Sequence, residues 1–269
     1  MVKERGGTPS ATNCLVGNDG TGYRRVSSSL PVDSEEPAPM TRPSPVIVFD
    51  LDGTLVDTAP DLIASLNHAL ADHGLAPVNP AAMRAFAGLG GKAMIERVHA
   101  ERRLRLEPET TASMVATFLA HYADTIPGTS LPYHGAMPAL ERLAAAGFSL
   151  AVCTNKPQAM SERLLEALAF GGHFSAVCGA DRFSFRKPDP RHLTETIALA
   201  GADPQRAVMV GDSRNDVATA KAAGIPVVAV EHGYSDIPVR ALEPSRVISH
   251  FDELTPALAR RLIDGTLDG

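Results

Sequence analysis

Short apolar runs alternate with helical stretches along the chain from Pro45 onward, and this alternation restricts the fold more than any other feature. Each run is almost continuously apolar, which is typical of a strand covered on both faces. Strand–helix alternation implies a parallel sheet with right-handed crossovers, so we expect an α/β fold with a doubly wound parallel sheet. The expected strands are Val46–Phe49, Ser149–Cys153, Ala176–Cys178, Ala207–Val210 and Val227–Val230.

Helices are expected between these strands, where apolar residues recur every three or four positions. Glycines stand where several of them should end, as at Gly147, Gly201 and Gly224. The expected helices are Ala136–Ala146, Gln158–Ala169, Arg191–Ala200 and Asn215–Ala223.

The interval between Phe49 and Ser149 breaks the alternation, because its pattern indicates helices only. Residues 58–61, Thr-Ala-Pro-Asp, resemble a capping box with an early proline, and the apolar stripe that follows ends at Gly74. We expect a helical cap over residues 58–128, inserted after the first strand, and a core made of residues 45–57 and 129–269. Further cap helices are expected at Pro80–Ala87, Lys92–Arg103 and Pro108–Ala123.

Residues 1–44 differ in composition from the rest of the chain. Gly, Pro, Ser and Thr make up 20 of them, and they show neither a helical nor a strand period. Such a segment buries too little apolar surface to offset its ordering entropy. We therefore expect a disordered N-terminal extension over residues 1–44.

Charge and cysteine content limit the partners and the compartment. The net charge is -6, which argues against nucleic acid or an anionic membrane as the main partner. Three widely spaced cysteines are typical of reduced thiols, so we expect a cytoplasmic protein. The expected assembly is a monomer or a homodimer.

Polar clusters follow the first, second and fourth expected strands directly, and one follows the third after a short loop. Ligands of an open parallel sheet bind beyond the carboxyl ends of its strands, so these clusters should meet at one edge. The convergence of four clusters is the main indication of a functional site. They are Asp50-Leu51-Asp52-Gly53-Thr54, Thr154-Asn155-Lys156, Lys187-Pro188-Asp189-Pro190 and Gly211-Asp212-Ser213-Arg214-Asn215-Asp216.

The charges of these clusters suggest a reaction. Asp50, Asp52 and Asp212 would repel one another unless a cation lay among them, and oxygen ligands favour Mg²⁺. Lys187 and the Thr154 hydroxyl would supply a positive charge and a donor, which suits a phosphoryl group. One carboxylate could attack phosphorus, and a second could protonate the leaving alcohol and then activate water.

At these residues the sequence resembles the haloacid-dehalogenase superfamily, over about residues 45–255. The resemblance implies that Asp50 is the nucleophile and Asp52 the general acid/base. It also implies that Asp50, Asp212 and the backbone carbonyl of Asp52 hold Mg²⁺. Thr154, Asn155 and Lys187 are then the substrate-binding residues. Asp216 is expected to support the metal directly or through water, and Asp57 falls where the family's flap leads into the cap.

The superfamily members that cleave carbon–halogen bonds or phosphonates do not keep an acid two residues after the nucleophile. Asp52 therefore favours phosphate esters, and the helical insertion is similar to the cap of the phosphoglycolate phosphatase subgroup. The strings at residues 153–157, 211–213 and 232–234 are most similar to bacterial phosphoglycolate phosphatases. This resemblance implies hydrolysis of 2-phosphoglycolate to glycolate and phosphate, so the expected partner is a small phosphorylated metabolite.

Other functions stay open at this point. The nearest is a sugar-phosphate mutase of the β-phosphoglucomutase type, which shares these motifs, and another is a phosphatase for a different small ester. A signalling receiver is disfavoured by the Asp50-x-Asp52 spacing and by the large insertion, and a non-catalytic binding module by the intact motifs. The glycine-rich segment Gly88–Lys92 could contact the distal group of the substrate or form a turn between cap helices.

Overall fold

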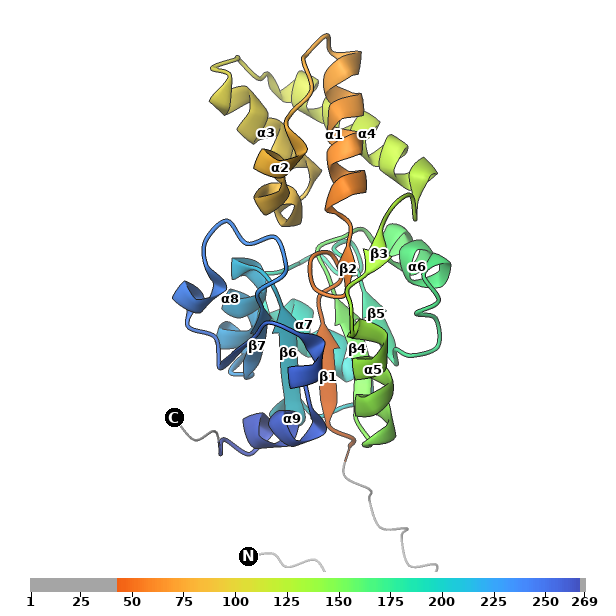
Figure 1. Cartoon of the computed structure of the whole chain (residues 1–269), viewed down its shortest axis with the longest axis vertical. Coiled ribbons are helices and arrows are strands. Elements are labelled where there is room, and N and C mark those ends of the chain that lie inside the picture. The colour runs from red at the N-terminus through yellow and green to blue at the C-terminus, as the bar shows by residue number, and fades with distance from the viewer. Residues whose placement is uncertain (1–42, 267–269) are drawn as a thin grey trace, which may run out of the picture. The chain divides into compact units, whose positions relative to one another are not determined.

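A six-stranded parallel sheet lies at the centre of the lower part of the molecule, as drawn in Figure 1. The computed structural model describes residues 43–266. The strand order is β5-β4-β1-β6-β7-β8, and every neighbouring pair is parallel. The strands are β1 (Val46–Phe49), β4 (Ser149–Cys153), β5 (Ala176–Cys178), β6 (Ala207–Gly211), β7 (Val227–Val230) and β8 (Arg246–Ile248).

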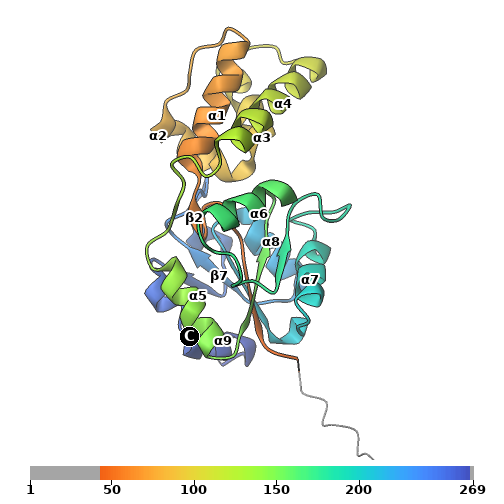
Figure 2. The ribbon, with the colours of Figure 1, turned by 90° about the vertical axis from the view of Figure 1, so that its right-hand side faces the viewer.

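Both faces of the sheet are covered, which confirms the doubly wound arrangement. Successive side chains of β1 enter opposite cores: Ile47 and Phe49 belong to one cluster, and Val46 and Val48 to the other. Helices α5, α6 and α9 contribute to the first core, and α7 and α8 to the second. Figure 2 shows α5 and α7 on opposite sides of the sheet. These helices are α5 (Ala136–Ala145), α6 (Gln158–Ala167), α7 (Pro190–Leu199), α8 (Arg214–Ala223) and α9 (Pro256–Ile263).

The sequence pattern located five of the six strands of this sheet. Four have the expected bounds, and β6 extends one residue further, to Gly211. The pattern missed β8, because this edge strand has only three residues and begins with the exposed Arg246. A short edge strand with a charged residue carries little of the apolar signal on which the prediction depends.

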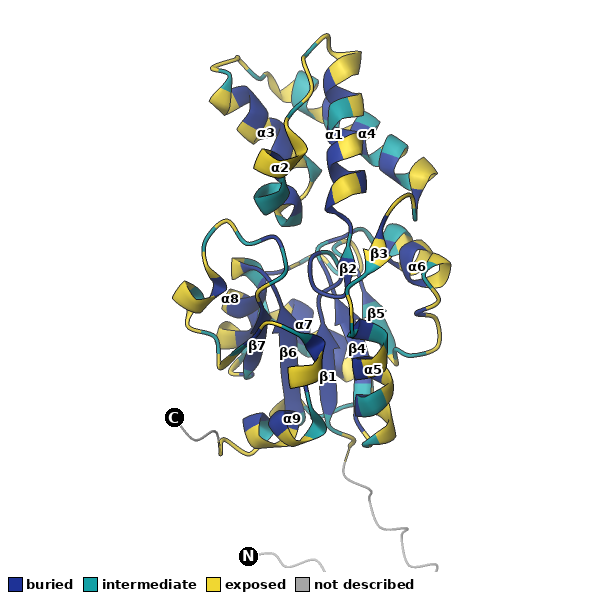
Figure 3. Ribbon diagram, in the orientation of Figure 1, coloured by how far each residue is buried: buried dark blue, intermediate teal, exposed yellow. Residues whose placement is uncertain are grey.

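A group of helices lies between β1 and β4 in the sequence, where the cap was expected. They are α1 (Ala59–Asp72), α2 (Pro80–Met83), the 3₁₀ helix η1 (Arg84–Leu89), α3 (Gly91–Glu101) and α4 (Pro108–Thr125). Each of the longer helices buries one stripe and exposes the other (Figure 3). Shorter 3₁₀ turns elsewhere are η2 (Pro204–Arg206), η3 (Val239–Leu242) and η4 (Phe251–Glu253).

The expectation that only helices lie between Phe49 and Ser149 is wrong. Val56–Asp57 (β2) pairs antiparallel with Leu131–Pro132 (β3), so the chain segments before α1 and after α4 run side by side. Strands of two residues are too short to show a period in the sequence. The division into a core and a cap at residues 58–128 stays a prediction, and the expected disordered extension lies almost entirely outside the described residues.

The expected capping box at Thr58 is also wrong. The Thr58 side chain makes no cap hydrogen bond, and its Oγ1 instead donates to Oδ1 of Asp52 over 2.9 Å. The Asp61 carboxylate accepts hydrogen bonds from Thr129 and Ser130, on the returning segment. These distant partners take the place of the local hydrogen bonds of a capping box.

Within residues 43–266, no helix is long and apolar enough to cross a membrane.

Candidate active site

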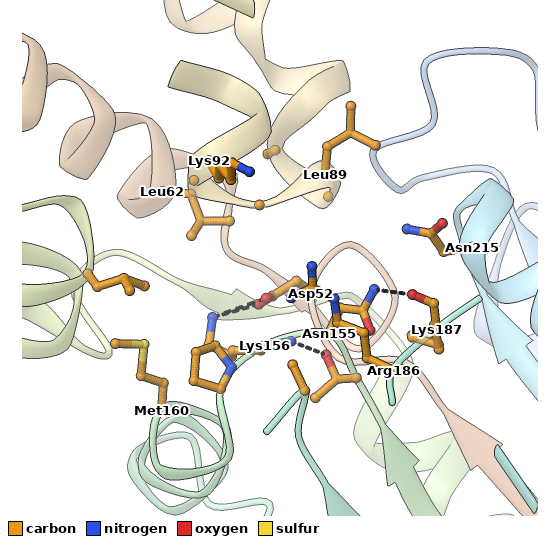
Figure 4. Close-up of a pocket in the computed structure, with 18 of the residues that line it drawn as sticks. Asp52, Leu62, Leu89, Lys92, Asn155, Lys156, Met160, Arg186, Lys187 and Asn215 are labelled. Atoms are coloured by element: carbon orange, nitrogen blue, oxygen red, sulfur yellow. Dashed lines mark hydrogen bonds and ion pairs between the residues drawn. The ribbon is translucent and has the colours of Figure 1, made fainter. Parts of the chain in front are cut away.

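The carboxyl ends of the central strands open onto a cavity of about 620 Å³ (Figure 4). Along the chain, β4 and β5 are added on one side of β1, and β6, β7 and β8 on the other. At such a switch point the loops that follow the strands diverge and leave a crevice between them. Five of the expected site residues line the cavity, and Gly88–Lys92 borders it from the helices inserted after β1. The five are Asp50, Asp52, Thr154, Asn155 and Lys187.

Asp50 stands at the end of β1, where its backbone N–H donates to the carbonyl of Val210 and so extends the β1–β6 ladder. Asp50 is 8% exposed, and its carboxylate pairs with the Lys187 ammonium, with 2.9 Å between Oδ1 and Nζ. Burial raises the pKa of Asp50 to about 6, the charge of Lys187 opposes this, and nearby Asp216 adds to it. A carboxylate that is buried, anionic at neutral pH and open to the cavity has the properties of a nucleophile.

Lys187 joins two of the acidic clusters. Its ammonium lies 2.6 Å from Oδ1 of Asp216, in addition to its contact with Asp50. Burial alone would lower the pKa of Lys187, but the two carboxylates raise it above its ordinary value. The Lys187 side chain therefore stays charged, and its position is fixed by the Asn155 amide, which donates to the Lys187 carbonyl over 3.0 Å.

Three buried carboxylates, those of Asp50, Asp212 and Asp216, each offer an oxygen within 4.8 Å of the others. Burial raises the pKa of Asp212 well above its usual range, and the charges of Asp216 and Asp50 add to the effect. Both Asp212 oxygens are oriented by donors, Thr54 Oγ1 at 2.8 Å and the Tyr234 backbone N–H at 2.7 Å.

This arrangement fits a divalent cation. Among the residues that the structure describes, these three carboxylates pair with one ammonium, that of Lys187, so the site has an excess of negative charge. Within residues 43–266, Oδ1 of Asp50 is buried and accepts no hydrogen bond of good geometry. All the donor atoms are oxygens, which suits Mg²⁺.

The metal-binding set expected from the sequence overlaps with this cluster at Asp50 and Asp212. The Asp216 carboxylate belongs to it as well, although Lys187 and the Ser213 N–H and hydroxyl already bind its two oxygens. The Asp52 side chain does not belong to this cluster, because it contacts Lys156 and Thr58 instead. The expected role of the Asp52 backbone carbonyl in metal binding stays a prediction.

Asp52 pairs with a lysine that the sequence analysis did not assign to the site. Nζ of Lys156 lies 3.0 and 3.1 Å from the two oxygens of Asp52 and donates to the Tyr122 hydroxyl over 2.7 Å. Burial alone would lower the pKa of Lys156, yet Asp52 raises it, so the ammonium stays charged. Burial raises the pKa of Tyr122 to about 12 despite the nearby ammonium, so the phenol stays protonated.

A signal for Lys156 was available, because it lies two residues beyond Thr154 in the same cluster. Tyr122 gave no such signal, since it belongs to the apolar stripe of α4. Thr154 is buried at the end of β4, where its N–H donates to the Cys178 carbonyl and its Oγ1 accepts from the Lys156 N–H over 3.2 Å. This acceptor contact leaves the Thr154 hydroxyl hydrogen able to turn toward a ligand.

Comparison with known proteins shows the family of the chain. Residues 47–230 match the model of the haloacid dehalogenase-like hydrolase family. A phosphoglycolate phosphatase from Mesorhizobium japonicum is 59% identical over 219 residues, covering 81% of this chain and 96% of its own. One from Agrobacterium fabrum is 46% identical over 220 residues, covering 82% and 94%.

The fold of the chain is also similar to that of a solved structure. The crystal structure of a predicted phosphoglycolate phosphatase from Haemophilus somnus superimposes with a TM-score of 0.73 at 30% identity, covering 80% of this chain and 97% of that one. The family match spans well over half of the chain, and the parallel sheet with helices on both faces agrees with it. The chain belongs to the haloacid dehalogenase-like hydrolase family.

Proposed function

We propose that the protein is a Mg²⁺-dependent phosphate monoester hydrolase that converts 2-phosphoglycolate to glycolate and phosphate through an aspartyl-phosphate on Asp50. The observation that carries this proposal is the placement of Asp50 and Asp52 at one cavity, with Lys187 and the buried acidic cluster beside Asp50. The names of the relatives that match at 59% and 46% identity support the choice of substrate.

In the first half of the reaction, a carboxylate oxygen of Asp50 attacks phosphorus and the bond from phosphorus to the ester oxygen breaks. Asp52 donates a proton to that oxygen, so that glycolate leaves with a neutral hydroxyl group in place of the ester oxygen. Lys187, the Thr154 hydroxyl and Asn155 bind the phosphoryl oxygens. Asp50, Asp212 and the Asp52 carbonyl would hold Mg²⁺, with Asp216 in support. When bound, Mg²⁺ would neutralise charge on the phosphoryl group.

In the second half, Asp52 accepts a proton from a water molecule, whose oxygen attacks phosphorus. The bond between Asp50 and phosphorus breaks, inorganic phosphate leaves, and both carboxyl groups return to their starting states. The sum is one ester and one water giving one alcohol and one phosphate. The pair needs no other acid or base.

The cavity is larger than the substrate requires, which supports a role for the helices inserted after β1. A cavity of about 620 Å³ is within the range that binds drug-sized ligands, whereas 2-phosphoglycolate has only nine heavy atoms, by its formula. Residues 58–128 would act as a cap that closes over the small ester. Closure would exclude bulk water while the aspartyl-phosphate forms.

The test is phosphate release from a panel of esters, with Mg²⁺ and with EDTA. The panel includes 2-phosphoglycolate, β-glucose 1-phosphate and glycerol 3-phosphate. The expected result is Mg²⁺-dependent release that is fastest with 2-phosphoglycolate. Release that peaks with another ester would contradict the substrate, and conversion of β-glucose 1-phosphate to glucose 6-phosphate without release would contradict hydrolysis.

The same proposal extends to the setting of the enzyme. A cytoplasmic location is supported by the free thiols of Cys153 and Cys178, both buried. Its partner would be the small phosphorylated substrate, and it would act as a monomer or a homodimer. Light scattering on the purified protein measures the assembly, and a trimer or larger would contradict this part.

A further inference from the structure

Lys156 is a buried charge at the substrate cavity whose role the proposed reaction leaves open. Its side chain is 2% exposed, yet it lines the same cavity as Asp50 and Asp52 (Figure 4). Its Nζ is held by both oxygens of Asp52 and by the Tyr122 hydroxyl, and it lies 4.2 Å from the centre of the Tyr122 ring. Burying an ammonium in this way is costly, which calls for a function beyond packing.

The distance from Lys156 to the reacting atoms matches the size of a small leaving group. In the proposed reaction the ester oxygen faces Asp52, and Nζ of Lys156 lies 3.0 Å from Oδ1 of that residue. In 2-phosphoglycolate the carboxylate is attached to the carbon next to the ester oxygen, so the carboxylate oxygens lie about 2.6 to 3.6 Å from the ester oxygen. A substrate whose ester oxygen contacts Asp52 therefore brings its carboxylate within reach of Lys156.

We propose that Lys156 recognises the substrate, binding an anionic group carried on the carbon next to the ester oxygen. This inference rests on the proposed function and names the class of ester that the site selects. The substrate carboxylate takes over part of the contact that Lys156 makes with Asp52, so the buried ammonium stays paired. Thr58 Oγ1 continues to orient Asp52 through its 2.9 Å hydrogen bond, leaving the Asp52 carboxyl to face the ester oxygen.

Lys92 is the matched alternative, because it lines the same cavity from the start of α3. Its side chain is 69% exposed, and its Nζ lies 3.5 Å from Glu96 on the next turn of the helix. An ammonium that is hydrated and paired at the surface discriminates weakly between charged and neutral ligands. A buried ammonium discriminates more strongly, because the surrounding medium screens its field less.

The test compares two substrates of nearly equal size, 2-phosphoglycolate and its neutral amide, 2-phosphoglycolamide. The ratio of their kcat/KM values measures recognition of the charge. We expect the wild-type enzyme to prefer the carboxylate by about 10- to 100-fold, the range of one hydrogen bond between charged groups. In Lys156→Met this ratio should fall to within about threefold of one, chiefly through a higher KM for 2-phosphoglycolate.

The variants separate recognition from other roles of the lysine. Lys156→Met also removes the ammonium beside Asp52, so it should slow hydrolysis of both esters, but its loss in kcat/KM should be at least about tenfold larger for the carboxylate than for the amide. Circular dichroism checks that the variant is folded. Lys156→Arg, which keeps the charge, should restore a preference for the carboxylate. Lys92→Met should leave the ratio unchanged.

Several results would overturn the inference. A wild-type ratio near one would do so whether or not the variants fold. An equal loss on both esters in Lys156→Met would indicate a structural or general catalytic role, and a collapsed ratio in Lys92→Met alone would move recognition to that residue. If the wild-type enzyme hydrolyses no ester of the panel, the proposed function fails, and this inference fails with it.

Discussion

The Tyr234 hydroxyl donates a 2.7 Å hydrogen bond to Oδ1 of Asp57, at the point where the chain leaves the sheet for α1. The same phenol oxygen accepts hydrogen bonds from the backbone N–H groups of Thr58 and Ala59, at 2.6 and 2.8 Å. The Tyr234 backbone N–H donates to Asp212. One residue therefore links the buried acidic cluster to the first turn of the inserted helices.

Tyr234→Phe should weaken this link. Two backbone donors and Asp57 would lose a buried partner, which should lower the free energy of unfolding by about 1 to 3 kcal/mol. Because the start of α1 would be less well positioned, we expect a higher KM for the preferred ester. Urea unfolding and steady-state kinetics measure both effects. Tyr133→Phe is the control, since the hydrogen bonds of its hydroxyl with the His232 carbonyl and Arg84 are long, at 3.3 and 3.5 Å. Equal effects in the two variants would contradict the assignment.

Asp61→Ala should destabilise the returning segment. The buried Asp61 carboxylate accepts from the backbone N–H of Thr129 at 3.0 Å and from the hydroxyls of Thr129 and Ser130 at 2.8 and 2.5 Å. Removing this acceptor leaves several donors unpaired, so unfolding should become easier by about 2 to 4 kcal/mol. Asp72→Ala, at the exposed end of the same helix, should change it by less than about 0.5 kcal/mol. A similar change in both variants, measured in urea, would show that the buried contacts are not the cause.

Asp50→Asn should abolish turnover and leave the protein folded. An amide cannot form the covalent phosphoryl intermediate, so the rate should fall by about 10,000-fold or more. The variant removes one of three neighbouring carboxylates, so its melting temperature in EDTA should equal or exceed that of the wild type. Phosphate release measures the loss of turnover, and thermal unfolding measures the melting temperature. Activity close to that of the wild type would exclude Asp50 as the nucleophile.

His192 should make the protein sensitive to acid. Burial, assisted by the charge of Lys187, lowers the pKa of His192 from 6.5 to about 4. The folded state thus binds fewer protons here than the unfolded state does. The stability that this group contributes is complete above pH 6.5 and is lost as the pH falls toward 4, with about 2 kcal/mol gone at pH 5.

The measurement is the free energy of unfolding at pH 7 and pH 5 for the wild type and for His192→Asn. Asparagine keeps an acceptor near the Lys187 backbone N–H, which donates to Nδ1 of His192 over 3.2 Å, but it does not titrate in this range. The variant should lose about 2 kcal/mol less than the wild type between the two pH values. His73→Asn, on an exposed residue, is the control. An identical loss in wild type and His192→Asn would refute the role of His192.

The sequence predicted those parts of the fold that depend on long apolar runs. Strands such as Val46–Phe49 are buried on both faces, so they stand out in the sequence, whereas β8, β2 and β3 are too short to do so. The capping box at Thr58 failed for a different reason. Thr58 and Asp61 have partners far along the chain or in the site, and a local motif cannot reveal such competition.

The sequence predicted those residues of the candidate site that follow the strands of the sheet. Asp50, Thr154 and Lys187 follow strands or the loop after one, and the topology of a parallel sheet brings them together. Tyr122 and Tyr234 could not be found in this way. Tyr122 reaches the site from a helix inserted after β1, and Tyr234 contacts Thr58, which lies 176 positions earlier in the sequence. Their roles arise from tertiary packing.

Trapping the phosphoryl group on Asp50 tests the central claim most directly. The enzyme is mixed with Mg²⁺ and 2-phosphoglycolate labelled with ³²P, quenched in acid within milliseconds, and digested for mass spectrometry. We expect a label on the peptide that contains Asp50, released by hydroxylamine as an acyl phosphate should be, and absent from Asp50→Asn. Rapid phosphate release with no labelled peptide, or with the label on another residue, would contradict covalent catalysis by Asp50.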